Sequence, residues 1–376
     1  MPRISDFAAQ YPNSHTRQAY ASSVFSFLAF IYNLPKEKRI TPKHQAKYET
    51  LADQYLNDHR NHSQDLISYA ASFEGKPAKT ARCYVSAVRE FLIFYDVEIS
   101  PKESRSLRNK LPKGGAATIE RDMDVDTLRS ILHHSNLMMN ALILMLASSG
   151  MRIGEALQLR TEDIDLSGKI GMISIRSETS KNGTQRYTFC SAEAVEAIRE
   201  WQKQRDQYLA GSLNKGRGLG ITKNPHDTRL FPVAQSTVRT AWENAIRASG
   251  FHSRDPRTNR LQIHIHMLRK FFSSQIRIVV PVDIVEGLLG HSGYLSDAYR
   301  RYTRKQVEEF YRKGEPYISI LMTEEIRDLK TNTETRLSAQ GEILESIVRE
   351  NMQLKHDVSE LKNLAEVFQR YLSKTD

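Results

Sequence analysis

Four short motifs place basic side chains and tyrosines along the middle and later parts of the chain. They are Ser149-Gly-Met-Arg152-Ile-Gly-Glu, His266-Met-Leu-Arg269, Leu289-Gly-His291 and Tyr299-Arg-Arg-Tyr302-Thr. Arginine suits phosphate because its planar guanidinium stays protonated and meets two oxygens at once. Histidine exchanges protons near neutral pH, and a tyrosine hydroxyl can act as a nucleophile. These residue types predict chemistry on a phosphate group, with positive side chains compensating the charge.

Other well-known catalytic signatures do not occur in the sequence. It contains no glycine-rich nucleotide loop, no His-Glu-x-x-His and no Ser-His-Asp pattern. Its two cysteines, Cys83 and Cys190, lie at no metal-ligand spacing, so we expect neither a zinc site nor a disulfide framework. We therefore expect a reaction without a metal ion or other cofactor.

The motif set resembles the tyrosine recombinases, the phage-integrase type. That family carries an Arg-x-Gly-Glu helix start, a hairpin Lys, a His-x-Leu-Arg, a Leu-Gly-His and a later nucleophilic Tyr. All five occur here in the same order, and the resemblance covers residues 14–315. It implies site-specific DNA recombination through a 3′-phosphotyrosine intermediate, which conserves the phosphodiester energy so that religation needs no ATP. It also implies a tetramer on double-stranded DNA that carries specific recombination sites.

The resemblance assigns a role to each candidate residue. Arg152 and Arg269 would clamp the non-bridging oxygens of the scissile phosphate. His266 and His291 would complete the phosphate contacts or move protons. Lys181, within Ser180-Lys-Asn-Gly-Thr184, would reach the minor groove and protonate the leaving 5′ oxygen.

The nucleophile is ambiguous between two tyrosines. The family's usual spacing from His291 falls on Arg300, which cannot serve as a nucleophile. We predict Tyr299, because Tyr299-Arg-Arg-Tyr-Thr-Arg resembles the Tyr-x-Arg pattern of archaeal-type members. Tyr302 is the alternative, since loop lengths vary near such sites.

Each residue, taken alone, also fits an ordinary structural role. Arg152 could pair with Glu155 at a helix start, and Lys181 could be a solvated turn residue. His266 falls in an alternating stretch, Ile263–Leu268, that could be a strand, and His291 could end a helix. The prediction of an active site therefore depends on the joint pattern.

The N-terminal segment, residues 1–109, is predicted to be a helical DNA-binding domain. Residues 14–31 and 79–94 each carry an apolar stripe at helical spacing, and residues 51–73 should form one or two further helices. A linker with Pro and paired Gly follows at residues 110–118. The basic residues predicted to contact DNA are Arg82, Arg89, Lys110 and Lys113.

Residues 119–316 are predicted to form the catalytic domain. Helices are expected at 125–132, 137–149, 192–209, 236–248 and 268–278, and short strands at 169–176 and 186–189. Asn182-Gly183 between the strands is a strong hairpin signal, and the stretch 211–220 is expected to be a glycine-rich loop. The predicted fold class is mainly α with a small β-sheet.

The tail, residues 317–376, shows coiled-coil spacing of apolar residues. They are Leu337, Leu344, Ile347, Leu354, Val358, Leu361, Ala365, Phe368 and Leu372. Asn351 is a polar residue of the same seam, of the kind that fixes register. We predict self-association through this helix, and the alternative is an amphipathic helix folded back on the rest of the chain.

Charge favours a polyanionic partner. The 376 residues carry a formal net charge of +10. Residues 317–376 hold 8 basic and 11 acidic residues, whereas residues 1–316 hold 46 basic and 33 acidic residues. A basic excess of this size is typical of a nucleic-acid-binding protein.

The longest apolar run, Ala141–Ala147, is too short for a membrane span, and the start of the sequence lacks a signal-peptide pattern. We expect a cytoplasmic, nucleoid-associated protein.

Two other functions fit the same motifs. A type IB topoisomerase shares the active site by resemblance, but it would relax DNA as a monomer. A DNA-binding protein of the same fold would bind DNA without cleaving it. The complete Arg, Lys, His, Arg, His and Tyr set favours an enzyme, because a binding protein needs no nucleophile.

Overall fold

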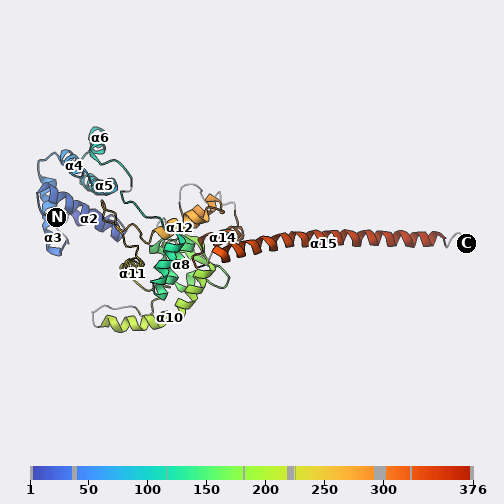
Figure 1. Cartoon of the computed structure of the whole chain (residues 1–376). Coiled ribbons are helices and arrows are strands. Elements are labelled where there is room, and N and C mark those ends of the chain that lie inside the picture. Colours follow the sequence, from blue (N-terminus) through green and yellow to red (C-terminus); the bar gives the residue numbers. More distant parts are fainter. Residues whose placement is uncertain are drawn as a thin grey trace. The chain divides into compact units, whose positions relative to one another are not determined.

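The computed structural model describes residues 3–35, 40–115, 117–180, 183–217, 224, 226–291, 302–321 and 324–372. Over these ranges the chain is mainly helical with one three-stranded sheet (Figure 1), which confirms the predicted fold class. The chain divides into two compact units. Unit 1 comprises Met1–Arg121 and Ser253–Gln262, and unit 2 comprises Asp122–His252 and Ile263–Asp376.

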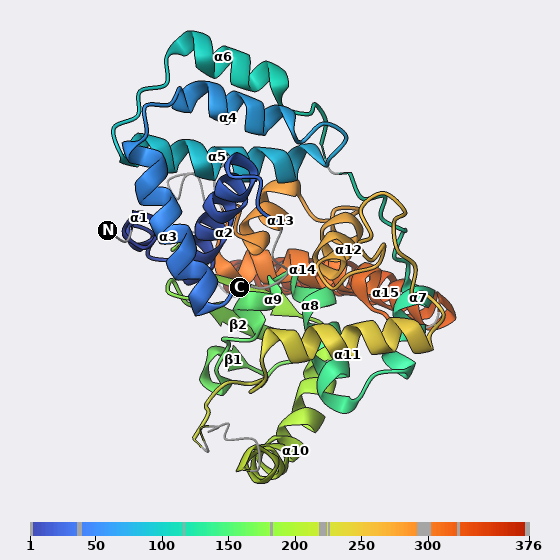
Figure 2. The same cartoon turned by 90° about the vertical axis from the view of Figure 1, so that its left-hand side faces the viewer.

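The described part of unit 1 contains six helices, of which α4, α5 and α6 lie side by side (Figure 2). They are α1 (Arg3–Ala9), α2 (Ser14–Ile31), α3 (Pro42–Asn57), α4 (His62–Ala71), α5 (Ala78–Phe94) and α6 (Pro101–Lys110). Helices α3 and α6 each begin with a proline behind a capping Thr41 or Ser100, which is the favoured helix start. Helices α1 and α6 were not predicted from the sequence.

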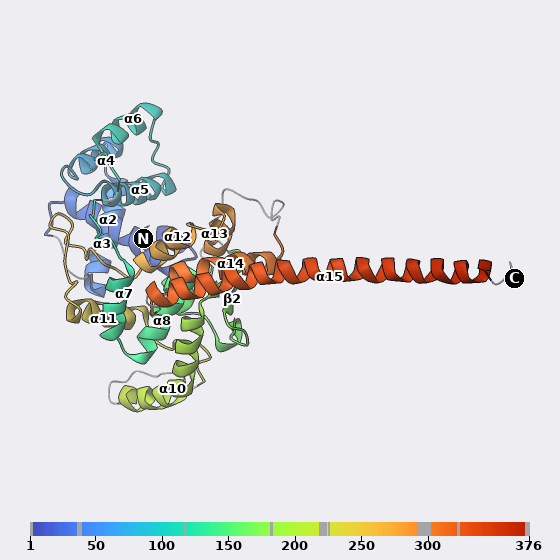
Figure 3. The ribbon, with the colours of Figure 1, turned by 45° about the vertical axis from the view of Figure 1, so that its right-hand side comes forward.

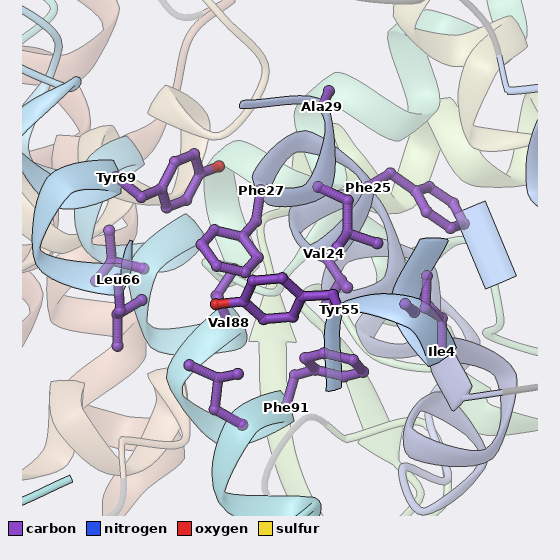
Figure 4. Packing of buried hydrophobic residues seen from close by; sticks show 14 of the residues in the cluster. Ile4, Val24, Phe25, Phe27, Ala29, Tyr55, Leu66, Tyr69, Val88 and Phe91 are labelled. Atoms are coloured by element: carbon purple, nitrogen blue, oxygen red, sulfur yellow. The ribbon is translucent and has the colours of Figure 1, made fainter. Parts of the chain in front are cut away.

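Aromatic rings fill the core of unit 1 (Figure 4). Phe27 of α2 packs edge-on against Tyr55 of α3 and Tyr69 of α4, with ring centroids 5.2 Å apart in both pairs. Val88 and Phe91 of α5 are fully buried in the same core. The apolar stripes that predicted α2 and α5 therefore do face inward, which is where most of their stabilising burial arises.

Unit 2 is built around one helix that is apolar on all sides. Helix α8 (Leu137–Ser149) is buried along nearly its whole length, as expected for a helix without a polar face. It contacts α10 (Ala192–Arg217), α12 (Met267–Ile276) and α14 (Arg304–Ile318). The other helices are α7 (Val125–His133), α9 (Ile153–Ala156), η1 (Thr161–Asp163), α11 (Gln235–Ala248), α13 (Val282–Leu289) and α15 (Glu324–Leu372).

The sheet is an antiparallel meander in the order β1 (Ile164–Asp165), β2 (Gly171–Ile175), β3 (Arg186–Cys190). Strands β2 and β3 pair from Gly171 opposite Cys190 to Ile175 opposite Arg186. This is the predicted hairpin. Strand β3 contacts α8 and α13, so its first residue, Arg186, is brought to the buried side of the sheet.

One local prediction was wrong, and one of the alternatives does not hold. Helix α10 continues to Arg217, so the predicted loop from Gly211 is helical at least that far. Each glycine costs a helix only about 1 kcal/mol, and the helix-forming residues around Gly211 and Gly216 offset this cost. His264 to His266 form a turn that leads into α12 instead of a strand, and His266 stands at the N-cap of that helix.

The loop Ser253–Gln262 is bonded to the segment that follows the predicted linker. The Asp255 carboxylate accepts hydrogen bonds from the backbone N–H of Ile119 at 2.9 Å and of Thr258 at 2.8 Å. These bonds lower the pKa of Asp255 to about 2. The Arg121 N–H also donates to the Gln262 carbonyl at 3.2 Å, so the chain is fixed to unit 1 up to that residue.

Two carboxylates join the end of α14 to the start of α10. Glu315 accepts the Ala192 N–H at 2.8 Å. Glu193 in turn accepts the N–H groups of Ile320 at 2.7 Å and Leu321 at 2.9 Å. The reciprocal bonds hold both ends of this junction against the unit 2 core.

Helix α15 is one continuous helix of 49 residues (Figure 3). Along it, nine large apolar side chains between Leu337 and Leu361 are exposed. The part of the chain that the structure describes contains no helix long and apolar enough to cross a bilayer.

Candidate active site

Arg152 follows a turn that requires glycine. Gly150 ends α8 in the left-handed conformation, with φ +63°. A β-carbon at Gly150 would lie 2.3 Å from Cδ1 of Phe272, so a side chain cannot be added there without displacing the ring. Arg152 then caps α9, and its side chain is 23% exposed. The turn thus presents a guanidinium at the surface of a rigid core.

Glu155 holds Arg152 from one side. Its carboxylate accepts the Arg152 backbone N–H at 2.8 Å and the Arg152 Nη1 at 3.1 Å. This is the ion pair considered above as the ordinary role of Arg152. The contact also orients the side chain, because both bonds restrict the same residue.

A second arginine, Arg186 of β3, binds the same carboxylate. Its Nη1 and Nη2 donate to the two Glu155 oxygens at 3.1 and 2.6 Å, and both side chains are nearly inaccessible to solvent. Burial alone would raise the pKa of Glu155, but the hydrogen bonds and charge of Arg186, together with Arg152, bring it below its ordinary value. Glu155 therefore stays ionised.

Arg186 also contacts the end of α13. Its Nε donates to the Leu288 carbonyl at 3.3 Å. Gly290 ends α13 with φ +69°, and a β-carbon there would lie 2.6 Å from Cδ of Arg186. The buried pair of Arg186 and Glu155 thus lies between the Arg152 turn and the segment that leads to His291.

Arg269 of α12 joins the C-terminal ends of two helices. Its Nη1 donates to the Gly150 carbonyl at 2.6 Å and its Nη2 to the Leu289 carbonyl at 2.7 Å. Helix C-termini favour cations because their carbonyls are unsatisfied. Arg269 is 7% exposed, so its guanidinium is fixed by α8 and α13 together.

His291 contacts the same guanidinium. Its Nε2 lies 2.9 Å from Nη2 of Arg269. A guanidinium only donates, so Nε2 accepts, and the proton of the neutral ring is on Nδ1. Nδ1 then donates to Glu286 Oε2 at 2.5 Å. Glu286 also pairs with Arg277.

His266 lies at the exposed rim of this cluster, three residues before Arg269. Partial burial, and then the positive charge of Arg269, lower the pKa of His266 below its ordinary value. The ring is therefore uncharged at neutral pH and available as a proton acceptor.

Positive charge exceeds negative charge in the described cluster. It contains four guanidinium groups, from Arg152, Arg186, Arg269 and Arg277, and two carboxylates, from Glu155 and Glu286. Burial and the charges of the neighbouring arginines lower the pKa of Arg269 to about 10. An anion bound here would relieve that repulsion, as a phosphate diester would. Within the described residues, no group of three His, Cys, Asp or Glu side chains could hold a metal ion.

The structure brings four of the predicted residues together: Arg152, His266, Arg269 and His291. Lys181 and Tyr299 lie outside the described residues. Tyr302 is half-buried just before α14, and its ring packs edge-on against Phe310 with centroids 5.6 Å apart.

The basic residues predicted to contact DNA are located in unit 1. Arg82 of α5 is exposed, and its guanidinium donates to the Gly114 carbonyl. Arg89 is half-buried, and its Nε has no hydrogen-bond partner among the described atoms. Lys110 and Lys113 are both exposed. Three of the four, Arg82, Lys110 and Lys113, are thus exposed to solvent.

Sequence reasoning did not identify Arg186 or Glu286 as part of the site. Arg186 was visible only as the first residue of a predicted strand. A charged residue at an inward position of a short strand is itself a signal, because such a residue requires a buried partner. Glu286 had no comparable signal, since its partners come from different elements.

Comparison with known proteins places this site in a family. Residues 121–309, half of the chain, match the model described as the phage integrase family. A tyrosine recombinase XerC of Alcanivorax borkumensis is 25% identical over 281 residues, which cover 70% of this chain and 84% of the relative. A tyrosine recombinase XerA of Saccharolobus solfataricus is 25% identical over 228 residues, covering 57% and 70%.

Solved structures similar to the chain include XerH bound to its difH substrate in a pre-cleavage complex, with 16% identity and a TM-score of 0.44. That alignment covers 77% of this chain and 94% of the XerH chain. The family model spans the segment in which the arginine and histidine motifs were recognised, which confirms the predicted family. The chain belongs to the phage integrase family of tyrosine recombinases.

Proposed function

We propose that the protein is a site-specific DNA recombinase that cuts and rejoins duplex DNA through a covalent bond to a tyrosine. The observation that carries this proposal is the pair Arg152 and Arg269. The Arg269 guanidinium binds the Gly150 carbonyl, two residues before Arg152, and the surrounding cluster has more positive than negative groups. Such a pair suits a phosphate whose two non-bridging oxygens must both be neutralised.

The reaction follows from these groups and from the family resemblance. The tyrosine oxygen attacks the scissile phosphorus while the bond from phosphorus to the 5′ oxygen breaks. The neutral His266 takes the tyrosine proton, and Lys181 gives a proton to the departing 5′ oxygen. Arg152 and Arg269 stabilise the extra negative charge of the pentavalent transition state. The reverse reaction, with a 5′ hydroxyl from another strand, completes the exchange.

Tyr299 is the proposed nucleophile, and Tyr302 is the alternative. We further propose that Arg82, Arg89, Lys110 and Lys113 contact the DNA backbone outside the reacting phosphate, and that four copies assemble on two recombination sites. The protein would accordingly be located on DNA in the cell.

Covalent trapping tests the proposal. The full chain is incubated without magnesium with nicked duplexes from the DNA that flanks its gene, and DNA-linked peptides are mapped by mass spectrometry. Tyr299→Phe and Tyr302→Phe are run in parallel. We expect an adduct on Tyr299 that is lost only in the Tyr299→Phe protein.

Other outcomes separate the alternatives. An adduct on Tyr302 would retain the chemistry and change the nucleophile. Relaxation of a supercoiled plasmid that has no partner site would favour a topoisomerase. Salt-sensitive binding to the flanking DNA with no adduct on any strand would contradict the proposed reaction and favour a binding protein.

A further inference from the structure

The exposed side of α15 carries more apolar surface than a single helix should leave in water. Its large apolar residues are between 46% and 67% exposed. They are Leu337, Ile343, Leu344, Ile347, Val348, Met352, Leu354, Val358 and Leu361. All except Met352, which lies beside the row, form a contiguous apolar surface of the kind that marks an interaction site. The partner can be derived from the spacing and the charges.

The spacing fits a two-stranded coiled coil. Steps of three and four residues alternate along the seam, which gives the 3.5-residue repeat of a left-handed coiled coil. Position a holds Leu337, Leu344, Asn351, Val358, Ala365 and Leu372. Position d holds Gln340, Ile347, Leu354, Leu361 and Phe368. Val358 at a between Leu354 and Leu361 at d favours two strands, whereas Leu344 at a with Ile347 at d favours a larger number. The single asparagine at position a, Asn351, selects two.

The charges beside the seam select a second copy in the parallel orientation. Position g holds Glu350 and then Asp357, and position e holds Lys355 and then Lys362. In a parallel pair each g residue faces the next e residue of the other strand, so acidic residues meet lysines. In an antiparallel pair g faces g and e faces e, so like charges would meet.

Asn351 fixes the register of that pair. A single asparagine at an a position specifies alignment and strand number at a cost in stability, because any shifted register buries its amide opposite an apolar residue. In the single helix its side-chain amide donates to the Ile347 carbonyl at 3.0 Å. Upstream, Lys330 and Thr333 occupy seam positions, so the paired region begins at Leu337.

We propose that residues 337–372 of two copies form a parallel, in-register coiled coil in which the two Asn351 residues face each other. The paired length is about 50 Å at 1.5 Å per residue. The interface is separate from the arginine cluster and requires no DNA. It therefore joins two recombinase chains before either meets a recombination site.

The first test uses two matched substitutions and no DNA. Leu354 and Met352 are 60% and 67% exposed, but only Leu354 lies in the seam. We expect the full chain to show about twice its 43.1 kDa mass by light scattering. Leu354→Glu should reduce it to a single chain, whereas Met352→Glu should leave it paired. A single-chain mass for the unmodified protein, or a pair that survives Leu354→Glu, would overturn the proposal.

The second test fixes the orientation. Leu344→Cys is made in a Cys83→Ser background, because Cys83 is exposed and Cys190 is buried. A parallel, in-register pair brings the two engineered thiols together, and mild oxidation should link nearly all of the chains. An intact pair that does not cross-link would rule out this register. Because neither test involves cleavage, failure here leaves the trapping experiment unaffected, and the reverse also holds.

Discussion

At the scale of single residues, the site depends on the shape of arginine as much as on its charge. Arg269 reaches two helix-end carbonyls and one histidine nitrogen with two of its nitrogens. Lysine offers one compact charged group, so it cannot fill both carbonyl positions and still face a phosphate oxygen. Lysine therefore cannot replace Arg269 in the proposed clamp.

This geometry predicts the effect of Arg269→Lys. Covalent adduct formation should fall by about 100-fold or more, with little change in DNA affinity, because the remaining basic residues still contact the backbone. Rates on a nicked substrate and gel-shift titrations measure the two effects. Arg312→Lys is the matched control, since Arg312 lies on an exposed face of α14 and pairs only with Glu308 among the contacts described. Equal rates for the two variants would contradict the clamp.

The lowered pKa of His266 predicts proton uptake on DNA binding. Phosphate offsets the charge of Arg269 and so raises the pKa of His266 toward its ordinary value of 6.5. Binding should then tighten as the pH falls from about 7.5 to about 6. Calorimetry in buffers with different ionisation enthalpies counts the protons. The His266→Gln variant should take up no proton on DNA binding. The control is His133→Gln, at an exposed histidine, which should leave proton uptake unchanged. Proton uptake that persists in the His266→Gln variant would mean that another group binds the proton.

At the scale of elements, the site is assembled from helix ends. The C-termini of α8 and α13, the N-terminus of α12 and the first residue of β3 meet around the arginines. The elements themselves follow from local patterns, since α2, α5, α7, α8 and β3 were predicted almost to the residue. Their meeting was not predictable, because Arg186 and Glu155 are 31 residues apart and no local pattern pairs them.

The same distinction applies to the incorrect loop prediction and to the strand alternative for His266. Helix α10 continues through Gly211 and Gly216 because the helix-forming residues around them outweigh two glycines, a balance that composition alone does not reveal. His266 alternates with apolar residues as a strand would, yet α12 begins there, because packing of Phe271 and Phe272 in the unit 2 core decides the conformation. Tertiary contacts override weak local preferences in both cases.

The turn at Gly150 predicts a difference between two alanine substitutions. Gly150 and Gly250 both have left-handed backbones, at φ +63° and +79°, but only Gly150 would place a β-carbon against side chains. Gly250→Ala should cost about 1 kcal/mol of unfolding free energy, and Gly150→Ala about 1–3 kcal/mol more. Urea denaturation of the two variants measures both. Equal losses of unfolding free energy in the two variants would mean that the Phe272 ring can move aside without destabilising the fold.

At the scale of the whole molecule, the basic and acidic residues are unevenly distributed along the chain. The basic excess lies in residues 1–316, and the acidic excess lies in the tail. The tail is therefore repelled by DNA at long range while the rest of the chain is attracted. A helix of this length with net negative charge is suited to contacts between protein chains and not to contacts with a duplex.

The basic body predicts steep salt dependence. DNA affinity should fall about a thousandfold between roughly 50 and 200 mM salt, because phosphate contacts release counterions. Replacing Lys110 and Lys113 with glutamine should reduce the slope of log affinity against log salt by about 2. Lys203→Gln is the control, since Lys203 pairs with Glu200 on α10. An unchanged slope in the double variant would remove these lysines from the DNA interface.

The bonds between Glu193, Glu315 and their backbone partners have a mechanical consequence. Any pull along α15 reaches the backbone at Leu321 and Ile320 first, where two N–H groups are anchored to a carboxylate of α10. A force along α15 is therefore transmitted to α10 and to the core around α8 before it reaches the start of α14 at Thr303. In the proposed pair, strain between the two tails during strand exchange would reach α10 and the core around α8 first. The start of α14, next to Tyr302, would receive little of that strain.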